Sequence, residues 1–501
     1  MTENPSTRSA RSKVSTGISG LDQILFGGFP RHRVYLVEGA PGTGKTTLAL
    51  QFLLQGREQG EQTLYVSLSE SKDELGDVAD SHGWSLEGIK LYELEATESR
   101  LKPEAEYTVF RPEDAELADT IQDVYQQVEG IKPSRVVFDS LSEMRLLARD
   151  PLKYRRQILA LKQFFTGRQC TVLLLDDLTA TDRDLQLQSI SHGVLSLDRL
   201  GQEYGPYRRQ LHVTKLRGAP FQEGCHDYII EKGGLNVFPR LVAADYRGDR
   251  DRSVFQSGIA ELDGLLGGAL HRGTSTLIIG PAGSGKSTLA AVYLLAAATR
   301  GEHAVSYVFE ESPDTFLDRM EAMGMDLKEH VASGKVSIQQ IDPAELSPGQ
   351  FAHQLRSDVE QRNVRVVVID SLNGYFNAMP NERFLLLQIH EVLNYLAAKG
   401  AVIILTMAQH GLVGAAMQSP VDVSYLADTL IMLRFFEYQG AVKRAISVVK
   451  HRKGAHEDTI RAFRLGSEGV RIGAPLKEFR GVLTGVPEYT GETSGLLDND
   501  K

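Results

Sequence analysis

The sequence predicts an α/β fold in which two tandem P-loop domains each contain a mostly parallel, doubly wound sheet flanked by helices. Three observations lead to this expectation: a long internal repeat, a glycine-rich phosphate loop in each copy of the repeat, and short apolar runs that alternate with helical stretches. The chain has 501 residues, far more than one ordinary hydrophobic core accommodates, so two or three domains are expected.

The repeat consists of four pairs of matching segments that keep their order along the chain. The first two pairs share one offset of 241 residues, as Asp22 and Asp263 show (263 − 22). The later pairs differ only in the lengths of the connecting loops. The matching segments are Thr16–Asp22 with Ser257–Asp263, Gly39–Thr46 with Gly280–Ser287, Val136–Ser140 with Val367–Ser371, and Val213–Arg217 with Val448–Arg452. Four ordered matches indicate a tandem duplication.

The duplication divides the chain into four parts. We expect a flexible N-terminal arm at 1–13, one domain at 14–245, a second domain at 246–475 and a C-terminal tail at 476–501. The seam lies in the charged stretch Ala244–Arg252, which has no apolar periodicity and is expected to be a linker. The last residues, from about Gly473, contain Gly, Pro and Thr and predict an extended, partly disordered tail.

Short runs rich in Val, Ile and Leu predict the buried strands of a parallel sheet. A helix is expected over Thr47–Gln55, directly after the first glycine-rich loop. The predicted strands of the first repeat are Arg33–Glu38, Thr63–Leu68, Arg135–Asp139 and Thr171–Asp176.

Composition limits the possible partners and the compartment. The net charge of −10 and the pI of about 5.8 make nucleic acid an improbable partner. Two cysteines, Cys170 and Cys225, lack the spacing of a disulfide framework or a zinc site, which favours a reduced, cytoplasmic protein. No run of 18 uninterrupted apolar residues occurs, and Met1–Val14 is polar, so we expect neither membrane insertion nor export.

Each repeat contains the pattern G-x-x-x-x-G-K-[ST] between an apolar run and a helical stretch. In such a loop the glycines let backbone N–H groups surround phosphate oxygens, and the lysine neutralises their charge. We therefore expect each repeat to bind ATP. The predicted nucleotide-binding residues are Gly39, Gly42, Thr43, Gly44, Lys45, Thr46 and Thr47 in the first repeat, and Gly280, Gly283, Ser284, Gly285, Lys286, Ser287 and Thr288 in the second.

A magnesium ion is expected with the nucleotide in both repeats. The hydroxyl groups of Thr46 and Ser287 are predicted to bind Mg²⁺ directly. Asp139 and Asp370 each end an apolar strand, as a Walker B aspartate does, and are predicted to hold the metal's outer shell. A turn or cap role for these aspartates is the alternative.

Hydrolysis needs a carboxylate that orients and activates water opposite the γ-phosphate. Glu310 and Glu311 are adjacent at the end of the strand that follows the second loop's helix, and both are candidate catalytic residues. The first repeat has Ser69 and Glu70 there, so its hydrolysis would depend on Glu70. A solvated strand end is the alternative interpretation.

Two Lys-x-Arg pairs, Lys215 with Arg217 and Lys450 with Arg452, each end an apolar strand in the late part of a repeat. Cations at this position can reach the γ-phosphate of a neighbouring subunit, as an arginine finger does. Otherwise they are solvated basic strand ends.

With these residues assembled, the chain resembles the KaiC family of circadian-clock-type ATPases, proteins of the RecA/DnaB superfamily with two tandem RecA-like domains, over about residues 14–490. The markers are the Gly-Ile-x-x-Leu-Asp motif that opens each repeat, both phosphate loops, Glu310-Glu311, both Lys-x-Arg pairs, and Ala427–Ile431 leading into Arg444–Val448. The resemblance implies a two-tier homohexameric ring with ATP between subunits, hydrolysis in the N-terminal ring, autokinase activity in the C-terminal ring, and regulatory or signalling partner proteins.

The resemblance also implies a phosphorylation site. The family phosphorylates an adjacent Ser-Thr pair shortly before the Asp-Thr-(Ile/Leu)-Ile strand, and this chain has Ser424-Tyr425 there. Ser424 is thus the implied acceptor, with Ser419 as a further position, although both also fit ordinary loop serines.

Two functions of other classes compete with this interpretation. A RecA- or DnaB-like nucleic-acid motor shares the fold and the phosphate loops, but the acidic net charge opposes it. A regulatory scaffold that uses ATP mainly to assemble, with little turnover, is the second alternative.

Overall fold

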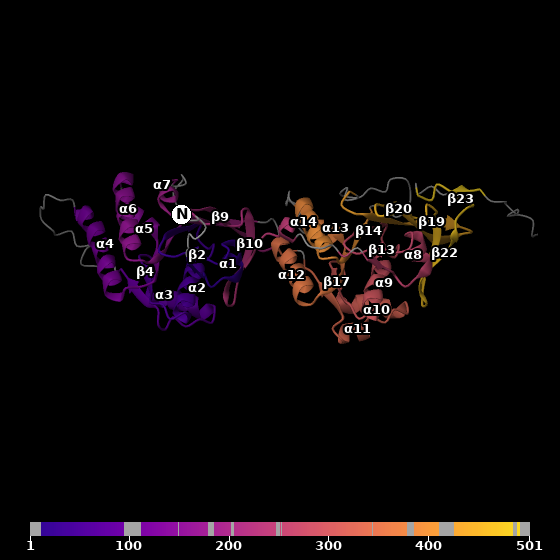
Figure 1. Cartoon of the computed structure of the whole chain (residues 1–501), viewed down its shortest axis with the longest axis horizontal. Helices are drawn as coiled ribbons and strands as arrows, with labels where there is room; N and C mark the ends of the chain where they lie inside the picture. The colour runs from indigo at the N-terminus through magenta and orange to yellow at the C-terminus, as the bar shows by residue number, and fades with distance from the viewer. Residues whose placement is uncertain are drawn as a thin grey trace, which may run out of the picture. The chain divides into compact units, whose positions relative to one another are not determined.

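The computed structural model describes residues 12–94, 112–148, 150–178, 185–201, 205–246, 251, 253–342, 344–377, 385–409, 425–483 and 488–490. The chain divides into two compact units, Met1–Arg240 (unit 1) and Leu241–Lys501 (unit 2), which Figure 1 shows with their helices and strands. The division falls a few residues before the expected boundary at 245/246. Residues 241–246 pack on unit 2, because the N–H of Ala243 donates to Glu391 at 2.8 Å and the rings of Tyr246 and Tyr395 lie 4.7 Å apart.

One large sheet forms the centre of unit 1. The strands from β8 to β5 run parallel, and β9, β10 and β11 extend the sheet antiparallel beyond β8. In spatial order the strands described are β11 (Gly234–Phe238), β10 (Cys225–Glu231), β9 (Arg208–Leu216), β8 (Gly193–Leu200), β3 (Val34–Gly39), β7 (Thr171–Asp176), β6 (Arg135–Asp139), β4 (Thr63–Ser67) and β5 (Lys90–Glu93).

Helices cover both faces of this sheet. Alternate residues of β3 enter different core clusters, since Tyr35 and Val37 pack with α2 whereas Val34 and Leu36 pack with α6. The helices of the first face are α1 (Ser19–Ile24), α2 (Lys45–Glu58) and α3 (Lys72–Ser81). Those of the second face are α4 (Pro112–Ile131), α5 (Leu141–Ala148), α6 (Pro151–Gly167) and α7 (Leu185–Ile190).

Unit 2 repeats this plan. Its parallel strands run from β16 to β19, and β20 to β22 extend the sheet antiparallel. The strands described are, in spatial order, β16 (Val336–Gln340), β15 (His303–Val308), β17 (Val364–Asp370), β18 (Val402–Ala408), β14 (Ser275–Gly280), β19 (Thr429–Tyr438), β20 (Ala441–His451), β21 (Arg461–Gly466) and β22 (Gly469–Pro475). The helices are α8 (Ala260–Leu265), α9 (Lys286–Thr299), α10 (Pro313–Ala322), α11 (Lys328–Ala332), α12 (Pro348–Gln361), α13 (Leu372–Asn377) and α14 (Leu385–Ala398).

The predicted fold class is confirmed, since each unit is a mostly parallel α/β sheet flanked by helices. The predicted strands Arg135–Asp139 and Thr171–Asp176 coincide with β6 and β7, and the other two lie within one residue of β3 and β4. The predicted helix Thr47–Gln55 is part of the longer α2. The antiparallel extension of each sheet was not part of the expectation.

The start of the first domain packs against its own core. Lys13 and Val14 form β1 (Lys13–Val14), which pairs with β2 (Phe29–Pro30), so the expected arm at 1–13 is shorter than predicted. The remainder of that arm, 1–11, lies outside the residues described. The same arrangement recurs in unit 2, where β12 (Val254–Phe255) pairs with β13 (Leu270–His271).

The C-terminal stretch is more structured than its composition suggested. Strands β23 (Phe479–Arg480) and β24 (Glu488–Tyr489) pair, and Val482 is buried against Phe436 and Ala445 of the β19–β20 hairpin. The expectation of an extended tail from 476 is therefore wrong for this part, because its apolar side chains cover that hairpin. Residues 491–501 lie outside the residues described.

The expected linker also contains an anchored residue. Asp251 accepts a hydrogen bond from Arg365 at 2.9 Å, and a second ion pair joins it to Arg272 at 3.6 Å. This aspartate is thus part of unit 2 and not simply a solvated linker residue. No helix among the residues described is long and apolar enough to cross a bilayer.

One buried cation allows a test of the unit 1 core. Arg135 has no exposed surface; it forms an ion pair with Glu61 and donates to the carbonyls of Ser15 and Phe52, both at 2.8 Å. The equivalent residue on β17 is Val366, which lies opposite Ala304 as Arg135 lies opposite Thr63. Unit 2 therefore lacks this charge.

We expect Arg135→Met to lower the free energy of unfolding of unit 1 by about 3–5 kcal/mol, because it leaves Glu61 and the carbonyls without this donor. Urea denaturation followed by the fluorescence of Trp84, the single tryptophan of the chain, reports on unit 1. The control is Arg168→Met, which removes an exposed ion pair with Glu129 and should cost less than about 1 kcal/mol. Equal losses in the two variants would contradict the role of Arg135.

Candidate nucleotide-binding site

The two phosphate loops connect the central strand of each sheet to the helix that follows. Gly44 has φ 92° and Gly285 has φ 104°, a left-handed conformation that favours glycine, directly before α2 and α9 begin. A Cβ at Gly39 would lie 2.6 Å from the carbonyl oxygen of Leu197 on the next strand. The glycines of the pattern are therefore needed where the backbone turns and where it touches β8.

The phosphate-loop lysines are buried in both units. Lys45 Nζ donates to the carbonyl oxygens of Gly39 at 2.8 Å and Ala40 at 3.2 Å, and it forms a 2.8 Å ion pair with Asp177, just after β7. In unit 2 the place of Asp177 is taken by Ala408, the partner of Gly280 in the parallel register. The ion pair therefore distinguishes the two loops.

Lys286 makes the same carbonyl contacts as Lys45, but among the residues described it has no ion pair like the one with Asp177, because Ala408 stands at that position. Its Nζ donates to Gly280 at 3.1 Å and to Pro281 at 2.9 Å. Burial lowers the pKa of Lys286, and the nearby carboxylates of Asp370 and Glu310 oppose that shift. These two carboxylates therefore lie close to the lysine.

The predicted metal-binding aspartates end β6 and β17, one strand removed from the phosphate loop. Asp139 accepts a hydrogen bond from the Tyr65 hydroxyl, and burial raises the pKa of this carboxyl. Asp370 accepts a hydrogen bond from the Thr406 hydroxyl and lines a pocket with Ser287. Hydroxyl and carboxylate oxygens are the hard donors that Mg²⁺ takes beside phosphate oxygens, so these residues fit that ion.

Glu70 lies beside these groups in unit 1. Its Oε2 is buried and accepts no hydrogen bond among the residues described. Burial, and then the carboxylates of Asp139, Glu74 and Asp177, raise the pKa of Glu70 to about 7, whereas Lys45 opposes the shift. Such a carboxyl is well suited to take a proton near neutral pH.

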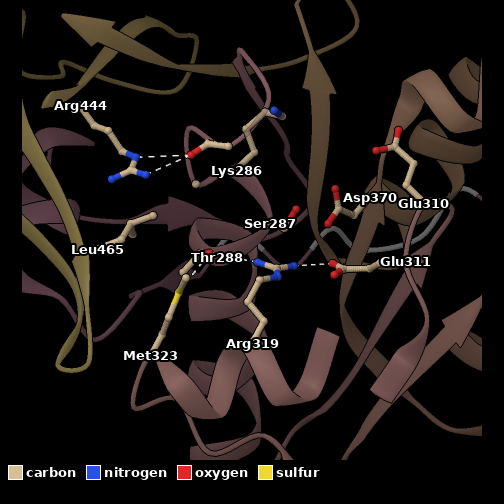
Figure 2. A pocket seen from close by; sticks show the side chains of 12 residues that line it. Lys286, Ser287, Thr288, Glu310, Glu311, Arg319, Met323, Asp370, Arg444 and Leu465 are labelled. Carbon is tan, nitrogen blue, oxygen red and sulfur yellow. Dashed lines mark hydrogen bonds and ion pairs between the residues drawn. The ribbon is translucent and has the colours of Figure 1, made fainter. Parts of the chain in front are cut away.

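In unit 2 eight of the predicted residues line one cavity of about 510 Å³, drawn in Figure 2, whereas Gly280, Ser284, Lys450 and Arg452 are not among its lining residues. Glu310 accepts a hydrogen bond from the Ser371 hydroxyl at 2.8 Å, and Glu311 forms an ion pair with Arg319. The residues that line the cavity are Gly283, Gly285, Lys286, Ser287, Thr288, Glu310, Glu311, Arg319, Met323, Asp370, Arg444 and Leu465. The structure thus brings the second phosphate loop, both glutamates and Asp370 together.

The Lys-x-Arg pairs lie away from their own phosphate loops. Lys215 pairs with Val194 of β8, which in turn lies beside Leu36, three residues before the loop begins at Gly39. At about 3.3 Å per residue, this is roughly 10 Å along the strand. Unit 2 has the same registers. Lys450 pairs with Leu430, and Leu430 lies beside Leu277, three residues before the loop begins at Gly280.

Each of these four cations donates to a backbone carbonyl of its own unit, in the segment just before β8 in unit 1 and just before β19 in unit 2. The hydrogen bonds run from Lys215 to Gln188, from Arg217 to Ser189 at 2.7 Å, from Lys450 to Ala427 at 2.7 Å, and from Arg452 to Tyr425 at 3.1 Å. The predicted phosphorylation positions Ser419 and Ser424 lie outside the residues described, and Tyr425, which follows them, is exposed.

Sequence reasoning missed several charged residues of the two sites. Asp177 follows an apolar run that was recognised, but which strand lies beside β3 is not readable from one sequence. Arg319 lies two turns into α10, eight residues after Glu311, and no local sequence spacing indicated this contact. Arg444 was quoted only as part of a motif, and it donates to the Gly283 carbonyl at 3.4 Å (Figure 2).

Comparison with known proteins identifies relatives of the whole chain. The family model described as "ATPase: KaiC" matches residues 14–242 and 255–477. The circadian clock oscillator protein KaiC of Picosynechococcus sp. is 27% identical over 95% of this chain and 92% of its own length. KaiC3 of Synechocystis sp., a circadian clock protein, is 25% identical over 97% of both chains. The circadian clock oscillator protein KaiC of Synechococcus elongatus is 27% identical over 97% of this chain and 93% of its own length.

The Lys45–Asp177 ion pair generates a prediction for nucleotide affinity. A phosphate that binds the loop must take Lys45 from Asp177 and then lie near that carboxylate. We expect Asp177→Asn to tighten nucleotide binding to unit 1 by roughly 3- to 10-fold. Calorimetric titration with ADP in a Lys286→Ala background isolates this site.

The control for that titration is Lys45→Ala, which should remove binding to unit 1. Weaker binding by Asp177→Asn would show instead that the aspartate helps to hold the nucleotide.

Proposed function

The chain belongs to the KaiC family of P-loop ATPases, and on this basis we propose that it assembles as a homohexameric ring, hydrolyses ATP with Mg²⁺ in both units and transfers phosphate to a serine of unit 2. The observation that carries the proposal is the convergence of Lys286, Glu310 and Asp370 on one cavity next to a phosphate loop. A signalling or clock-type regulatory role is suggested by the names of the relatives, which are circadian clock proteins.

In hydrolysis an oxygen of water attacks the γ-phosphorus, and the bond from that phosphorus to the bridging oxygen of ADP breaks. The proton of the water passes to a carboxylate, and ADP and phosphate leave. Lys45 and Lys286 neutralise phosphate charge, while the loop N–H groups hold the oxygens. Glu70 in unit 1 and Glu310 or Glu311 in unit 2 supply the carboxylate.

The metal would be held by Thr46 and Asp139 in unit 1 and by Ser287 and Asp370 in unit 2. When bound, Mg²⁺ neutralises charge on the β- and γ-phosphates. Among the residues described, no group of three or more His, Cys, Asp or Glu side chains could by itself hold a metal ion. In the proposed site a hydroxyl, one carboxylate, phosphate and water would share the ion.

The ring is supported by the position of the Lys-x-Arg pairs. Lys215, Arg217, Lys450 and Arg452 lie near the amino end of the strand whose carboxyl end bears the phosphate loop, so they are poorly placed for their own nucleotide. In a ring they would contact the γ-phosphate held by the next subunit.

Phosphate transfer to a serine uses the same groups. A hydroxyl replaces water as the attacking group, its proton passes to the same carboxylate, and ADP leaves. The proposed acceptor is Ser424, with Ser419 as the second position. Tyr425 places a bulky side chain where the family has a threonine, and it is a poorer acceptor for a site that fits small hydroxyls.

Assembly is expected to depend on nucleotide, because ATP between subunits stabilises the oligomer that it bridges. Light scattering should detect a hexamer with Mg-ATP and smaller species after nucleotide removal. The double variant Arg217→Ala with Arg452→Ala should make hexamer formation depend less on nucleotide. Arg168→Ala, which removes an exposed arginine, is the matched control and should leave that dependence unchanged. A monomer saturated with ATP would exclude the ring.

The raised pKa of Glu70 predicts the pH dependence of unit 1. The carboxylate accepts a proton only when it is ionised, so activity is present above the pKa of about 7 and is lost as the pH falls through it. In Lys286→Ala protein we expect turnover to fall about tenfold for each pH unit below 7. Glu70→Gln should lower turnover by about 10²–10⁴ and abolish this dependence. A flat profile down to pH 5 would refute the role of Glu70.

Phosphate transfer is tested by mass spectrometry after incubation with Mg-ATP. We expect one added phosphate at Ser424, its loss in Ser424→Ala with turnover preserved, and its loss together with turnover of unit 2 in Glu310→Gln with Glu311→Gln. Continued hydrolysis without any incorporated phosphate would leave an ATPase and exclude the autokinase.

A further inference from the structure

The two units differ at one residue of the helix that follows the catalytic strand. Ser71 and Ser312 are the N-caps of α3 and α10, and each accepts a hydrogen bond from the N–H three residues later. Seven residues beyond each cap, unit 1 has Val78 and unit 2 has Arg319 (78 − 71 = 319 − 312). Val78 packs against the core of unit 1. Arg319 lines the cavity of unit 2.

The Arg319 guanidinium lies between a carboxylate and the phosphate-loop helix. One nitrogen forms the ion pair with Glu311 Oε1, and the other donates to the Thr288 hydroxyl at 3.3 Å (Figure 2). The Phe316 ring lies 5.4 Å beneath the guanidinium. These contacts fix both the arginine and the carboxylate that it pairs with.

Glu311 is consequently the glutamate that is turned away from the phosphate lysine. The carboxylates that act on Lys286 are those of Asp370 and Glu310. Glu310 is also oriented by the Ser371 hydroxyl at 2.8 Å, next to Asp370. Glu310 thus acts electrostatically on Lys286 and accepts a hydrogen bond beside Asp370, whereas Glu311 pairs with the arginine.

Unit 1 shows where the same position lies without the arginine. Glu70 precedes its N-cap serine as Glu311 precedes Ser312, and Ser69 takes the place of Glu310. Glu70 lies close enough to Lys45 and Asp139 for their charges to act on it. With valine in place of arginine, the carboxylate at this position is buried and lies within electrostatic reach of the phosphate-loop lysine.

We propose that Arg319 is a positioning residue: it bridges Glu311 and the Thr288 hydroxyl, and so leaves Glu310 as the carboxylate that faces the reacting phosphate in unit 2. Unit 1 has Val78 instead of this arginine and uses Glu70, which stands at the position of Glu311. The inference rests on the proposed ATPase function of unit 2. It assigns the two adjacent glutamates different tasks, and it makes the choice between them depend on one side chain outside the phosphate loop.

The first experiment measures ATP turnover in a Lys45→Ala background, in which only unit 2 binds nucleotide. Glu310→Gln should lower turnover at least about 10²-fold, and Glu311→Gln less than about 5-fold. In Arg319→Val protein, Glu311 is released, and the added Glu310→Gln should then cost less than about 10-fold. The proposal would be overturned if Glu310→Gln lowered ATP turnover by the same factor in the Arg319 and the Arg319→Val backgrounds.

Conservative and reciprocal variants separate positioning from general packing. Arg319→Lys keeps a cation for Glu311 and should retain the full dependence on Glu310. Val78→Arg, in a Lys286→Ala background, should draw Glu70 away from Lys45 and lower the turnover of unit 1 by about 10². Because that change is made at a partly buried position, Trp84 fluorescence must first show that unit 1 is folded. Undiminished turnover in folded Val78→Arg protein would count against the proposal.

A readout without turnover distinguishes this inference from the proposed function. Carbodiimide with an added amine labels accessible carboxylates, and peptide mass spectrometry reports Glu310 and Glu311 separately after fragmentation. We expect Glu311 to be labelled several-fold faster in Arg319→Val than in the wild-type chain, with Glu310 unchanged. Equal labelling of Glu311 would refute the proposal even if unit 2 hydrolyses ATP. Faster labelling in a unit 2 that does not hydrolyse ATP would support the positioning contact and reject the proposed function of that unit.

Discussion

The contact on which the remaining geometry depends is the approach of each phosphate loop to the next strand of its own sheet. A Cβ at Gly39 or Gly280 would lie 2.6 Å from the carbonyl oxygen of Leu197 or Leu433, so these positions accept glycine alone without a shift of the backbone. Because the loop leaves the centre of a parallel sheet, the neighbouring strands all end at the same edge. The acids at the ends of β4, β6 and β7 therefore gather around one lysine, although they are far apart in the sequence.

The two copies of the duplication have diverged mainly in the charges around that lysine. Unit 1 has Asp177 on its lysine, and burial together with the neighbouring carboxylates raises the pKa of Glu70 to about 7. Unit 2 has alanine in place of Asp177, adds Glu310, and gives Glu311 the Arg319 guanidinium as a partner. The backbone framework is common to both units, so the difference in chemistry lies in a few side chains at strand ends.

The sequence alone predicted the fold class, the phosphate loops and most of the acids at strand ends, because glycine patterns and buried apolar runs are local signals. It did not predict Asp177 as a partner of Lys45, since that contact depends on which strands are neighbours. The packing of residues 479–482 was missed for a related reason: Phe479 and Val482 pack on the apolar surface of the distant β19–β20 hairpin. The local composition of a segment is a poor predictor of its structure when that structure depends on contacts with residues far away in the sequence.

The carbonyl contacts of the Lys-x-Arg pairs have a mechanical consequence. Lys450 and Arg452 donate to the carbonyls of Ala427 and Tyr425, one to three residues after Ser424. In the proposed ring, a cation that turned to a phosphate of another subunit would give up this hydrogen bond, so residues 425–427 would lose a restraint when the neighbouring site is loaded. Nucleotide binding to one subunit and release of the segment after Ser424 in the next subunit would then be thermodynamically linked, so that each would favour the other.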